Sequence, residues 1–463
     1  FNTEQGFMDA LYGIYVNMGK SDLYGGTLQT ALDMTAQYYS YYDISECPYG
    51  HYQTFEYEHP SCTAISDALW MRIYYCIGLT NNLLKYLDKP EAVQICSNYD
   101  YLRGEALALR AYLHFELIRI FAPDVKKNPE YKSIPYRKTF SPDIEPQLKV
   151  KEVYQEILAD LTEAKQLLSN DVIRTNGPDW LGESEKKEES DDVTDKNEGY
   201  YTSDFLKTRK YRMNYYAVLG TLARVHLTLG TTDDMEKAYD YAMEVIESGK
   251  FRPIQEEHIL VSGEQAKYRD ILFTDEFIFG LYSAQVDAFY KSNFDESYGV
   301  KKILINKLSD IYGQGTRDLR QTHWFKTSWG TSYLLKHNAD LEYAKEKVRM
   351  ITLAEMYYIA AEAHPAEAYD LLEEILPSRE IHSSLPVNAG RTEVLTEVLK
   401  EYRKEYIGDG QFFYAYKRLI EEEAAILPLG INIPNENKVL VWPLPQDEIK
   451  YGDRESGIWK TEK

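Results

Sequence analysis

The spacing of hydrophobic positions along the chain predicts long amphipathic helices. Residues 66–88 place apolar side chains every three or four positions, and Ser66 is a candidate N-cap. Residues 101–121 and 150–169 repeat this spacing. Pro123 ends the helix predicted for residues 101–121, because proline disfavours helix in the residue before it.

Two further stretches predict pairs of helices. Residues 213–249 carry small residues such as Ala217 and Gly220 on one face, which lets a second helix approach closely, and Gly230 is a candidate C-cap. Residues 349–376 repeat the scheme. Paired helices that stack through small residues are typical of tetratricopeptide units. The predicted fold class is therefore mostly α, with tetratricopeptide-like helical hairpins and a loop-rich irregular region containing minor β structure.

The pattern predicts a single unit in which a helical scaffold carries long insertions. The scaffold comprises about residues 66–122, 150–169, 213–250, 349–376 and 391–420. The insertions comprise about residues 36–62, 171–205, 251–345 and 377–390. Residues 271–283 have the composition of a short β segment followed by a turn, so some strand content is expected in the insertions.

Composition excludes several classes of protein. The 463 residues are 44% hydrophobic and 27% charged, which is typical of a globular chain. The formal net charge of -22 argues against nucleic acid or an anionic membrane surface as direct partner, because like charges repel. No apolar run is long enough to predict a bilayer-spanning helix.

The sequence lacks the common catalytic motifs. It contains no HExxH zinc helix, no GxxxxGK[ST] phosphate loop and no GxSxG elbow. The 74 acidic residues leave a glycosidase carboxylate pair open, but chance proximity explains any chosen pair better. We expect a protein that is not an enzyme and has no cofactor. Asp191, Asp195 and Asn197 could hold a structural calcium ion weakly, although the EF-hand spacing is absent.

The four cysteines, Cys47, Cys62, Cys76 and Cys96, lie in the first hundred residues. None forms a CxxC pair or has a histidine at ligand spacing, which argues against zinc. An even number permits disulfides in a secreted chain, but the sequence does not show how they would pair.

Several blocks of sequence resemble one family. The segment LRGEALALRAYLHFELIRIF within 101–121 resembles the GEA-x-x-L-R-A helix of the SusD/RagB family, which are nutrient-binding outer-membrane lipoproteins of Bacteroidetes. Further blocks follow in the family's order at 69–84, 217–251, 349–363 and 442–449. The matching residues Glu105, Arg110, Glu355 and Glu362 are expected to make intramolecular polar contacts.

One block departs from the family pattern. Glu401, Glu405, Asp409-Gly410 and Arg418 match it, whereas Tyr402, Phe412 and Ala415 replace an Arg, an Arg and an Asp. We interpret the lost charges as part of a buried polar network whose loss is compensated.

The resemblance implies a function. Members of the family are held on the outer face of the outer membrane by an N-terminal lipid, whose cysteine would precede Phe1 here. They capture oligosaccharides, or in some cases peptides, and cover a SusC-like TonB-dependent transporter. The helical face is implied to dock the transporter, and the variable loops to bind the ligand.

Tyrosine is unusually abundant, with 41 Tyr against 16 Phe and 6 Trp. Flat rings can cover the apolar faces of sugars while a hydroxyl offers a hydrogen bond, although any single ring is more often packed in the interior. Two aromatic loop regions, 38–57 and 312–333, have this composition, and Tyr290 and Tyr298 in 285–299 could join the second. The predicted ligand-binding residues are Tyr39, Tyr41, Tyr42, Tyr49, Tyr52, Tyr290, Tyr298, Arg317, Asp318, Trp324 and Trp329.

Our hypothesis is non-catalytic oligosaccharide binding followed by delivery to the transporter. Two alternatives stay open: peptide capture by the same architecture, and a tetratricopeptide-type adaptor that holds a protein segment in its helical groove. The sequence does not identify the glycan or the oligomeric state.

Overall fold

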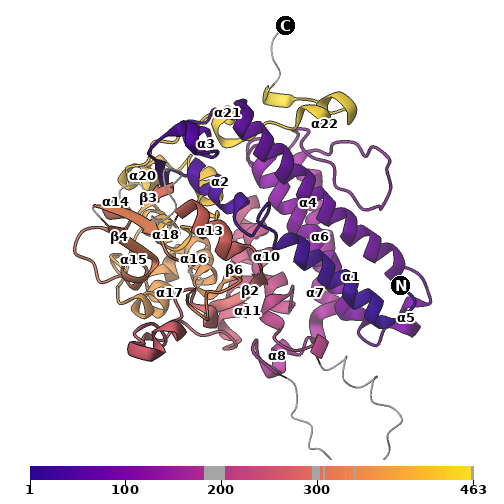
Figure 1. Ribbon diagram of the computed structural model, residues 1–463, viewed down its shortest axis with the longest axis horizontal. Helices are drawn as coiled ribbons and strands as arrows, with labels where there is room; N and C mark the ends of the chain where they lie inside the picture. The colour runs from indigo at the N-terminus through magenta and orange to yellow at the C-terminus, as the bar shows by residue number, and fades with distance from the viewer. Residues whose placement is uncertain (182–203, 295–302, 306–307, 329, 338–339, 460–463) are drawn as a thin grey trace, which may run out of the picture.

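The computed structural model describes residues 1–181, 204–294, 303–305, 308–328, 330–337 and 340–459. Helices dominate it, and the strands form small two-stranded sheets (Figure 1). This confirms the mostly α fold class. Within these residues, no helix has both the length and the apolar character that a bilayer crossing requires.

A layer of long helices forms one side of the molecule (Figure 1). α6 (Tyr99–Phe121) packs between α4 (Pro60–Leu87) and α7 (Val150–Leu167), and α1 (Glu4–Met18) lies against α4. Almost every side chain of α6 from Gly104 onward is buried. α6 has no wide polar face because neighbours cover it all round.

The start of α4 differs from the prediction. Its N-cap is His59, whose ring accepts a hydrogen bond from the backbone NH of Ser61. Ser66, the predicted cap, is buried inside the helix, where its hydroxyl lies 2.7 Å from the hydroxyl of Tyr52. Pro60 explains the earlier start, because proline is favoured in the first turn of a helix.

The predicted hairpins are present. α10 (Tyr215–Leu229) and α11 (Thr232–Glu247) pair, and Gly230 between them has φ +66°, as a glycine C-cap requires. α11 packs on α16 (Leu353–Ala363), which pairs with α17 (Ala368–Ile375). The hairpins therefore stack side by side.

Residues 347–352 were predicted in part as helix but form strand β6 (Lys347–Thr352). β6 pairs antiparallel with β2 (Phe277–Tyr282), which confirms the β segment predicted within 271–283. The close approach to Gly220 is also made by this strand, since a Cβ there would lie 2.9 Å from Ile351 Cγ2. At Gly220, therefore, the small face of α10 admits a strand.

The other two sheets lie in the insertions, and one of them joins two insertions that are distant in the sequence. β1 (Tyr39–Tyr41) pairs antiparallel with β3 (Ile303–Ile305), and β4 (Phe325–Ser328) pairs with β5 (Thr331–Leu334). Further helices of the described residues are α2 (Thr27–Thr35), α3 (Gly50–Gln53), α5 (Ala92–Ile95), α8 (Ile173–Asn176), α12 (Glu256–Ile259), α13 (Val286–Phe294), α14 (Leu308–Tyr312), α15 (Leu319–Trp324), α18 (Arg391–Glu405), α19 (Phe412–Leu419), α20 (Glu423–Ile426), α21 (Asn437–Leu440) and α22 (Gln446–Tyr451).

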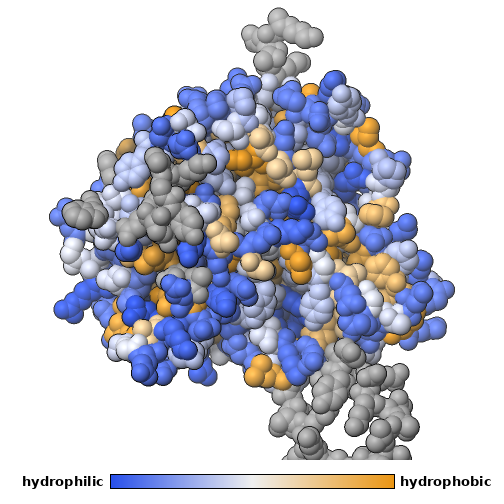
Figure 2. Space-filling view, viewed as in Figure 1, coloured by the Kyte–Doolittle hydropathy of each residue, from blue (hydrophilic) through white to orange (hydrophobic). Residues whose placement is uncertain are grey.

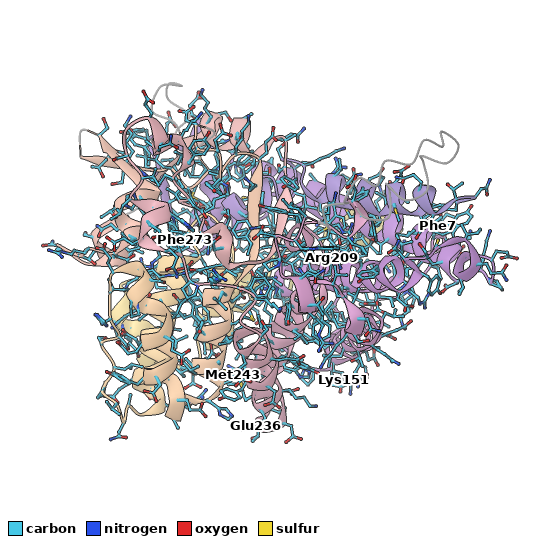
Figure 3. All side chains as sticks on the ribbon, turned by 90° about the horizontal axis from the view of Figure 1, so that it is seen from below. Phe7, Lys151, Arg209, Glu236, Met243 and Phe273 are labelled. Atoms are coloured by element: carbon cyan, nitrogen blue, oxygen red, sulfur yellow. The ribbon has the colours of Figure 1, made fainter. Side chains whose placement is uncertain are left out.

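Buried ion pairs tie the elements together, as expected for the matching family residues. Glu105 accepts hydrogen bonds from Arg212 (2.7 Å) and from the hydroxyl of Tyr15 (2.6 Å), and it also pairs with Arg209 near the middle of the molecule (Figure 3). The other expected contacts join Arg110 to Asp160, Glu355 to Arg224, and Glu362 to Arg418.

The four cysteines are free thiols, and all are buried. Burial raises the pKa of Cys62 and of Cys76 to about 12.

The face of the molecule seen in Figure 2 is largely hydrophilic, with apolar side chains scattered in small groups. This agrees with the acidic composition.

Candidate functional site

The pairing of β1 with β3 brings parts of the two predicted ligand-binding regions together. β3 also packs against β5. Tyr42 follows β1 directly, and its hydroxyl lies 3.5 Å from Thr331 Oγ1 at the start of β5. We call the surface formed by Tyr41–Asp43 and the β4–β5 hairpin the loop face.

The loop face combines a flat ring with a row of hydroxyl groups. Tyr42 is 62% exposed. Beside it, Thr327 Oγ1 on β4 lies 3.0 Å from Ser332 Oγ on β5. Ser328 and Thr331 stand opposite each other at the end of the hairpin. A ring next to hydroxyl donors and acceptors suits a ligand with both an apolar face and hydroxyl groups.

Buried hydrogen bonds fix the strand that carries Tyr42. The hydroxyl of Tyr39 donates to Asp33 Oδ2 (2.9 Å), and Gln53 Nε2 donates to the carbonyl of Tyr39 (2.7 Å). Asp33 also accepts from the backbone NH groups of Gly408 (2.6 Å) and Gly410 (3.1 Å). Burial raises the pKa of Asp33 to about 8, against the opposing effect of these donors. The loop face therefore rests on a rigid base.

Six predicted ligand-binding residues lie in the interior instead, and for them the prediction of direct ligand contact is wrong for this conformation. They are Tyr39, Tyr49, Tyr52, Tyr290, Asp318 and Trp324, each less than a tenth exposed. The indole NH of Trp324 donates to the carbonyl of Ile271 (2.6 Å), and Asp318 caps α15 and pairs with Arg320. The five aromatic side chains among them belong to one hydrophobic cluster that extends through both the scaffold and the insertions.

Three of the predicted residues stay accessible. Tyr42 and Arg317 are exposed, and Tyr41 is half-buried, with its ring close to Gly50. Tyr298, Trp329 and the calcium candidates Asp191, Asp195 and Asn197 lie outside the described residues. Within the described ranges, no three His, Cys, Asp or Glu residues gather as a metal site would require.

Sequence reasoning missed the β4–β5 hairpin and its hydroxyl groups. The signal was present as FKTSWGTSYL, in which Thr-Ser stands on either side of Trp-Gly. The register pairs Ser328 with Thr331, which leaves a two-residue connection ending in glycine. Such a connection between β-prone residues is a hairpin signal.

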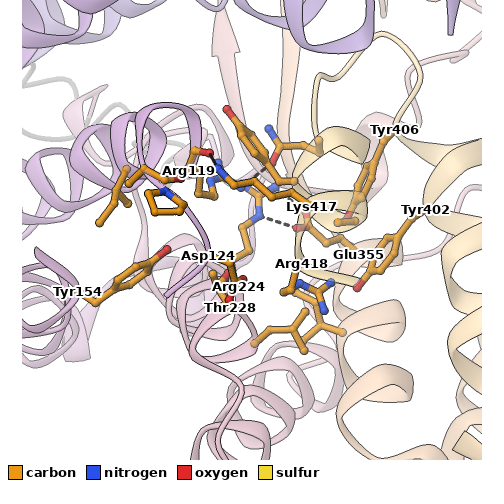
Figure 4. A pocket seen from close by; sticks show the side chains of 18 residues that line it. Arg119, Asp124, Tyr154, Arg224, Thr228, Glu355, Tyr402, Tyr406, Lys417 and Arg418 are labelled. Atoms are coloured by element: carbon orange, nitrogen blue, oxygen red, sulfur yellow. Dashed lines mark hydrogen bonds and ion pairs between the residues drawn. The ribbon is translucent and has the colours of Figure 1, made fainter. Parts of the chain in front are cut away.

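A small cavity lies within the helical scaffold, between α6, α10, α16, α18 and α19 (Figure 4). Its volume is about 60 Å³, enough for a few water molecules but far below the size of a sugar pocket. Its charged groups have partners: Arg224 pairs with Glu355, and Lys417 Nζ donates to the carbonyls of Arg119 (2.8 Å) and Ala122 (2.5 Å). The cavity is part of the scaffold.

A family model described as SusD-like, starch-binding and associating with the outer membrane matches residues 15–177. The match covers α4, α6 and α7, the part of the chain where the sequence motifs are densest. A comparison with curated protein sequences finds no significant match.

Solved structures share the fold over the whole chain. A SusD superfamily protein from Bacteroides thetaiotaomicron is 21% identical with a TM-score of 0.70, covering 97% of this chain and 98% of that one. A second, from Bacteroides vulgatus, is 20% identical with a TM-score of 0.70 and full coverage of both chains. A structure described as a laminarin-binding SusD-like protein is 18% identical with a TM-score of 0.65, covering 99% of this chain and 100% of that one.

Proposed function

We propose that this chain binds oligosaccharides on its loop face without altering them chemically, because a SusD-like family model matches residues 15–177. The observation that carries the proposal is Tyr42, which is 62% exposed and held within reach of the Thr331 hydroxyl by the β1–β3 pairing. The starch-binding description of the matching family and the laminarin-binding neighbour support the ligand class.

The chemistry of the loop face fits this ligand. A pyranose ring has an apolar face that can lie on the Tyr42 ring, while its hydroxyl groups exchange hydrogen bonds with Thr327, Thr331 and Ser332. None of these groups is an activated nucleophile or a general acid, so the arrangement holds a glycan without cleaving it.

We further propose that the protein works at the outer membrane, held there by a lipid anchor. From there it would pass the bound oligosaccharide to a SusC-like TonB-dependent transporter. The family description supports association with the outer membrane. Co-purification of the full-length lipoprotein with a TonB-dependent transporter from outer membranes would support this step, and recovery of the lipoprotein alone would contradict it.

Calorimetric titration with laminarin and starch oligosaccharides tests the binding proposal. Replacing Tyr42 by Ala should weaken binding at least tenfold, because the stacking surface is lost. Tyr75→Ala is the matched control: Tyr75 is 50% exposed, but it lies on α4 in the helical layer. Its replacement should leave the affinity unchanged.

Other outcomes would favour the alternatives. Peptide binding with no response to any glycan would favour peptide capture. Loss of function on Tyr75→Ala but not on Tyr42→Ala would favour an adaptor that uses the helical face. New reducing ends in proportion to added protein would show glycoside hydrolysis and overturn the proposal.

A further inference from the structure

A second surface has the chemistry of a sugar site. It is a cleft of about 530 Å³ between the end of α8 and the segment that follows α11, and we call it the Trp180 cleft. Its size is within the usual range for small-molecule sites. α8 lies at the lower edge of Figure 1, well away from β3 and β4 of the loop face. The residues lining the cleft include Asn176, Asp179, Trp180, Lys250, Arg252, His258 and Asp275.

The wall that carries Trp180 is tied to buried parts of the fold. The backbone NH of Thr208 donates to the carbonyl of Trp180 (2.9 Å). Lys210, itself buried, pairs with Asp179 Oδ1 (2.6 Å) and donates to the carbonyl of Thr274 (3.2 Å). Across the cleft, the backbone NH of Arg252 donates to the carbonyl of Asp275 (3.3 Å). The cleft is therefore held in shape from both sides.

The backbone leaves room in this cleft. Gly177 and Gly249 line it with φ of +89° and +60°, and a Cβ on either would meet no atom within 4 Å. The Trp180 side chain is half-buried, so part of its indole stays accessible to a ligand.

The charged side chains of the Trp180 cleft differ in whether they have a charged partner. Of its two acids, Asp179 pairs with Lys210, and Asp275 Oδ2 lies 2.9 Å from the ring nitrogen Nδ1 of His258. Among the described parts of the chain, Lys250 Nζ donates only to a backbone carbonyl, that of Thr175 (3.0 Å). Arg252 is exposed, and its guanidinium has no partner among the residues that the structure describes. Lys250 and Arg252 thus place two cationic groups in the cleft, in a chain whose net charge is -22.

We propose that the Trp180 cleft binds a sugar unit that carries a carboxylate, such as a hexuronic acid residue of an oligosaccharide. The indole of Trp180 covers the apolar face of the sugar ring. The guanidinium of Arg252 pairs with the carboxylate, since its parallel NH groups match the two carboxylate oxygens. Asn176 and Lys250 face the sugar hydroxyl groups. This second site extends the proposed glycan binding to acidic chains and is separate from the loop face.

Nuclear magnetic resonance of the indole NH groups in the whole chain tests the inference at the site itself. The chain has 6 Trp, and Trp180→Phe identifies the Trp180 signal by its loss. Trigalacturonate and glucuronate-containing oligosaccharides should shift this signal, and neutral maltotriose at the same concentration should not. The inference is overturned if no acidic sugar moves the signal, or if the neutral sugar moves it equally.

Variants separate this inference from the loop-face proposal. Arg252→Ala should weaken trigalacturonate binding at least tenfold, Arg252→Lys should restore part of it, and Arg391→Ala, an exposed arginine elsewhere, should have no effect. In Tyr42→Ala the Trp180 response should persist. A Trp180 response that disappears in Tyr42→Ala would overturn the separate site. Unchanged neutral-glycan affinity in Tyr42→Ala would instead overturn only the loop-face proposal.

Discussion

At the scale of single residues, aromatic rings that are close in the sequence differ in whether they pack in the interior or are available to a ligand. Tyr39 and Tyr42 lie three residues apart, yet one is fully buried and the other is 62% exposed. Tyr39 lies within β1 and its ring packs 5.2 Å from that of Phe294, whereas Tyr42 lies just beyond the end of β1 and projects from the surface. The abundance of tyrosine in a loop therefore does not identify which rings meet a ligand.

Trp324 illustrates the difference between a packed and an available ring. The sequence predicted it to bind ligand, but in the structure it is a core residue. Its ring lies 5.3 Å from that of Phe273, and Lys336 Nζ lies 4.1 Å from its centroid. Trp324→Ala should lower the free energy of unfolding by about 3–5 kcal/mol, through lost burial and the cavity that remains. Urea denaturation measures this. Tyr42→Ala should change stability by less than about 0.5 kcal/mol, and equal losses in both variants would contradict the assignment.

Lys417 gives a pH dependence at the same scale. Burial lowers its pKa to about 7, whereas an unfolded lysine titrates near 10.4. Between these values the unfolded chain binds the extra proton, so the contribution of Lys417 to stability rises with pH across the window, by at most about 1.4 kcal/mol per pH unit.

Lys417→Met removes the titrating group. The difference in unfolding free energy between wild type and Lys417→Met should change in favour of wild type as pH rises from 7 to 10. A difference that stays constant over this range would show that Lys417 keeps its ordinary pKa.

At the scale of elements, packing between segments decided whether a short apolar stretch forms a helix or a strand, which the hydrophobic spacing alone left open. Residues 347–352 carry apolar side chains compatible with helix, but they form β6 because β2 offers a partner strand beside α10. Gly220 on α10 is where the strand comes closest. Short apolar runs fit either a helix or a strand by periodicity alone.

Gly220→Leu tests this contact. The new side chain would overlap Ile351, so we expect a loss of about 1–3 kcal/mol in unfolding free energy. Ile351→Ala in the same chain should recover part of that loss, which a double-mutant cycle measures. Gly78→Ala is the control: Gly78 on α4 has no atom within 4 Å of an added Cβ, and alanine should stabilise the helix by about 0.5–1 kcal/mol. Additive effects of Gly220→Leu and Ile351→Ala would contradict the contact.

At the scale of the whole molecule, a buried charge cluster joins the insertions to the scaffold. Glu405 on α18 accepts from Arg349 of β6 (2.6 Å) and Arg320 of α15 (3.0 Å), and Arg379 lies 3.5 Å away. Burial alone would raise the pKa of Glu405, but the three arginines outweigh it and hold the pKa well below its ordinary value. The stabilisation is therefore present above the unfolded pKa, near 4.3, and is lost as pH falls further.

Glu405→Gln should cost about 3–5 kcal/mol at neutral pH, because it leaves buried arginines without their counter-charge. The difference from wild type should shrink below pH 4 in denaturation measured across pH. Glu130→Gln, an exposed glutamate that pairs with Lys149 and Lys151, should change stability little. Equal effects of the two replacements would contradict a joining role for the cluster.

The sequence by itself determined the helical scaffold, its hairpins and the resemblance that led to the family. Those features depend on the spacing of residues that are close in the sequence, as in α6 and in the glycine cap at Gly230. Such spacing can be read directly from the sequence. It also located the two regions that meet at the loop face.

Only the tertiary structure decided which rings in those regions are exposed. Tyr42 and Trp324 were both candidates from aromatic loop regions, and their burial depends on segments distant in the chain. The Trp180 cleft is also a product of tertiary structure, since it brings residues 176–180 to residues 249–275. Exposure and enclosure are properties of packing between distant segments, and a linear pattern does not record them.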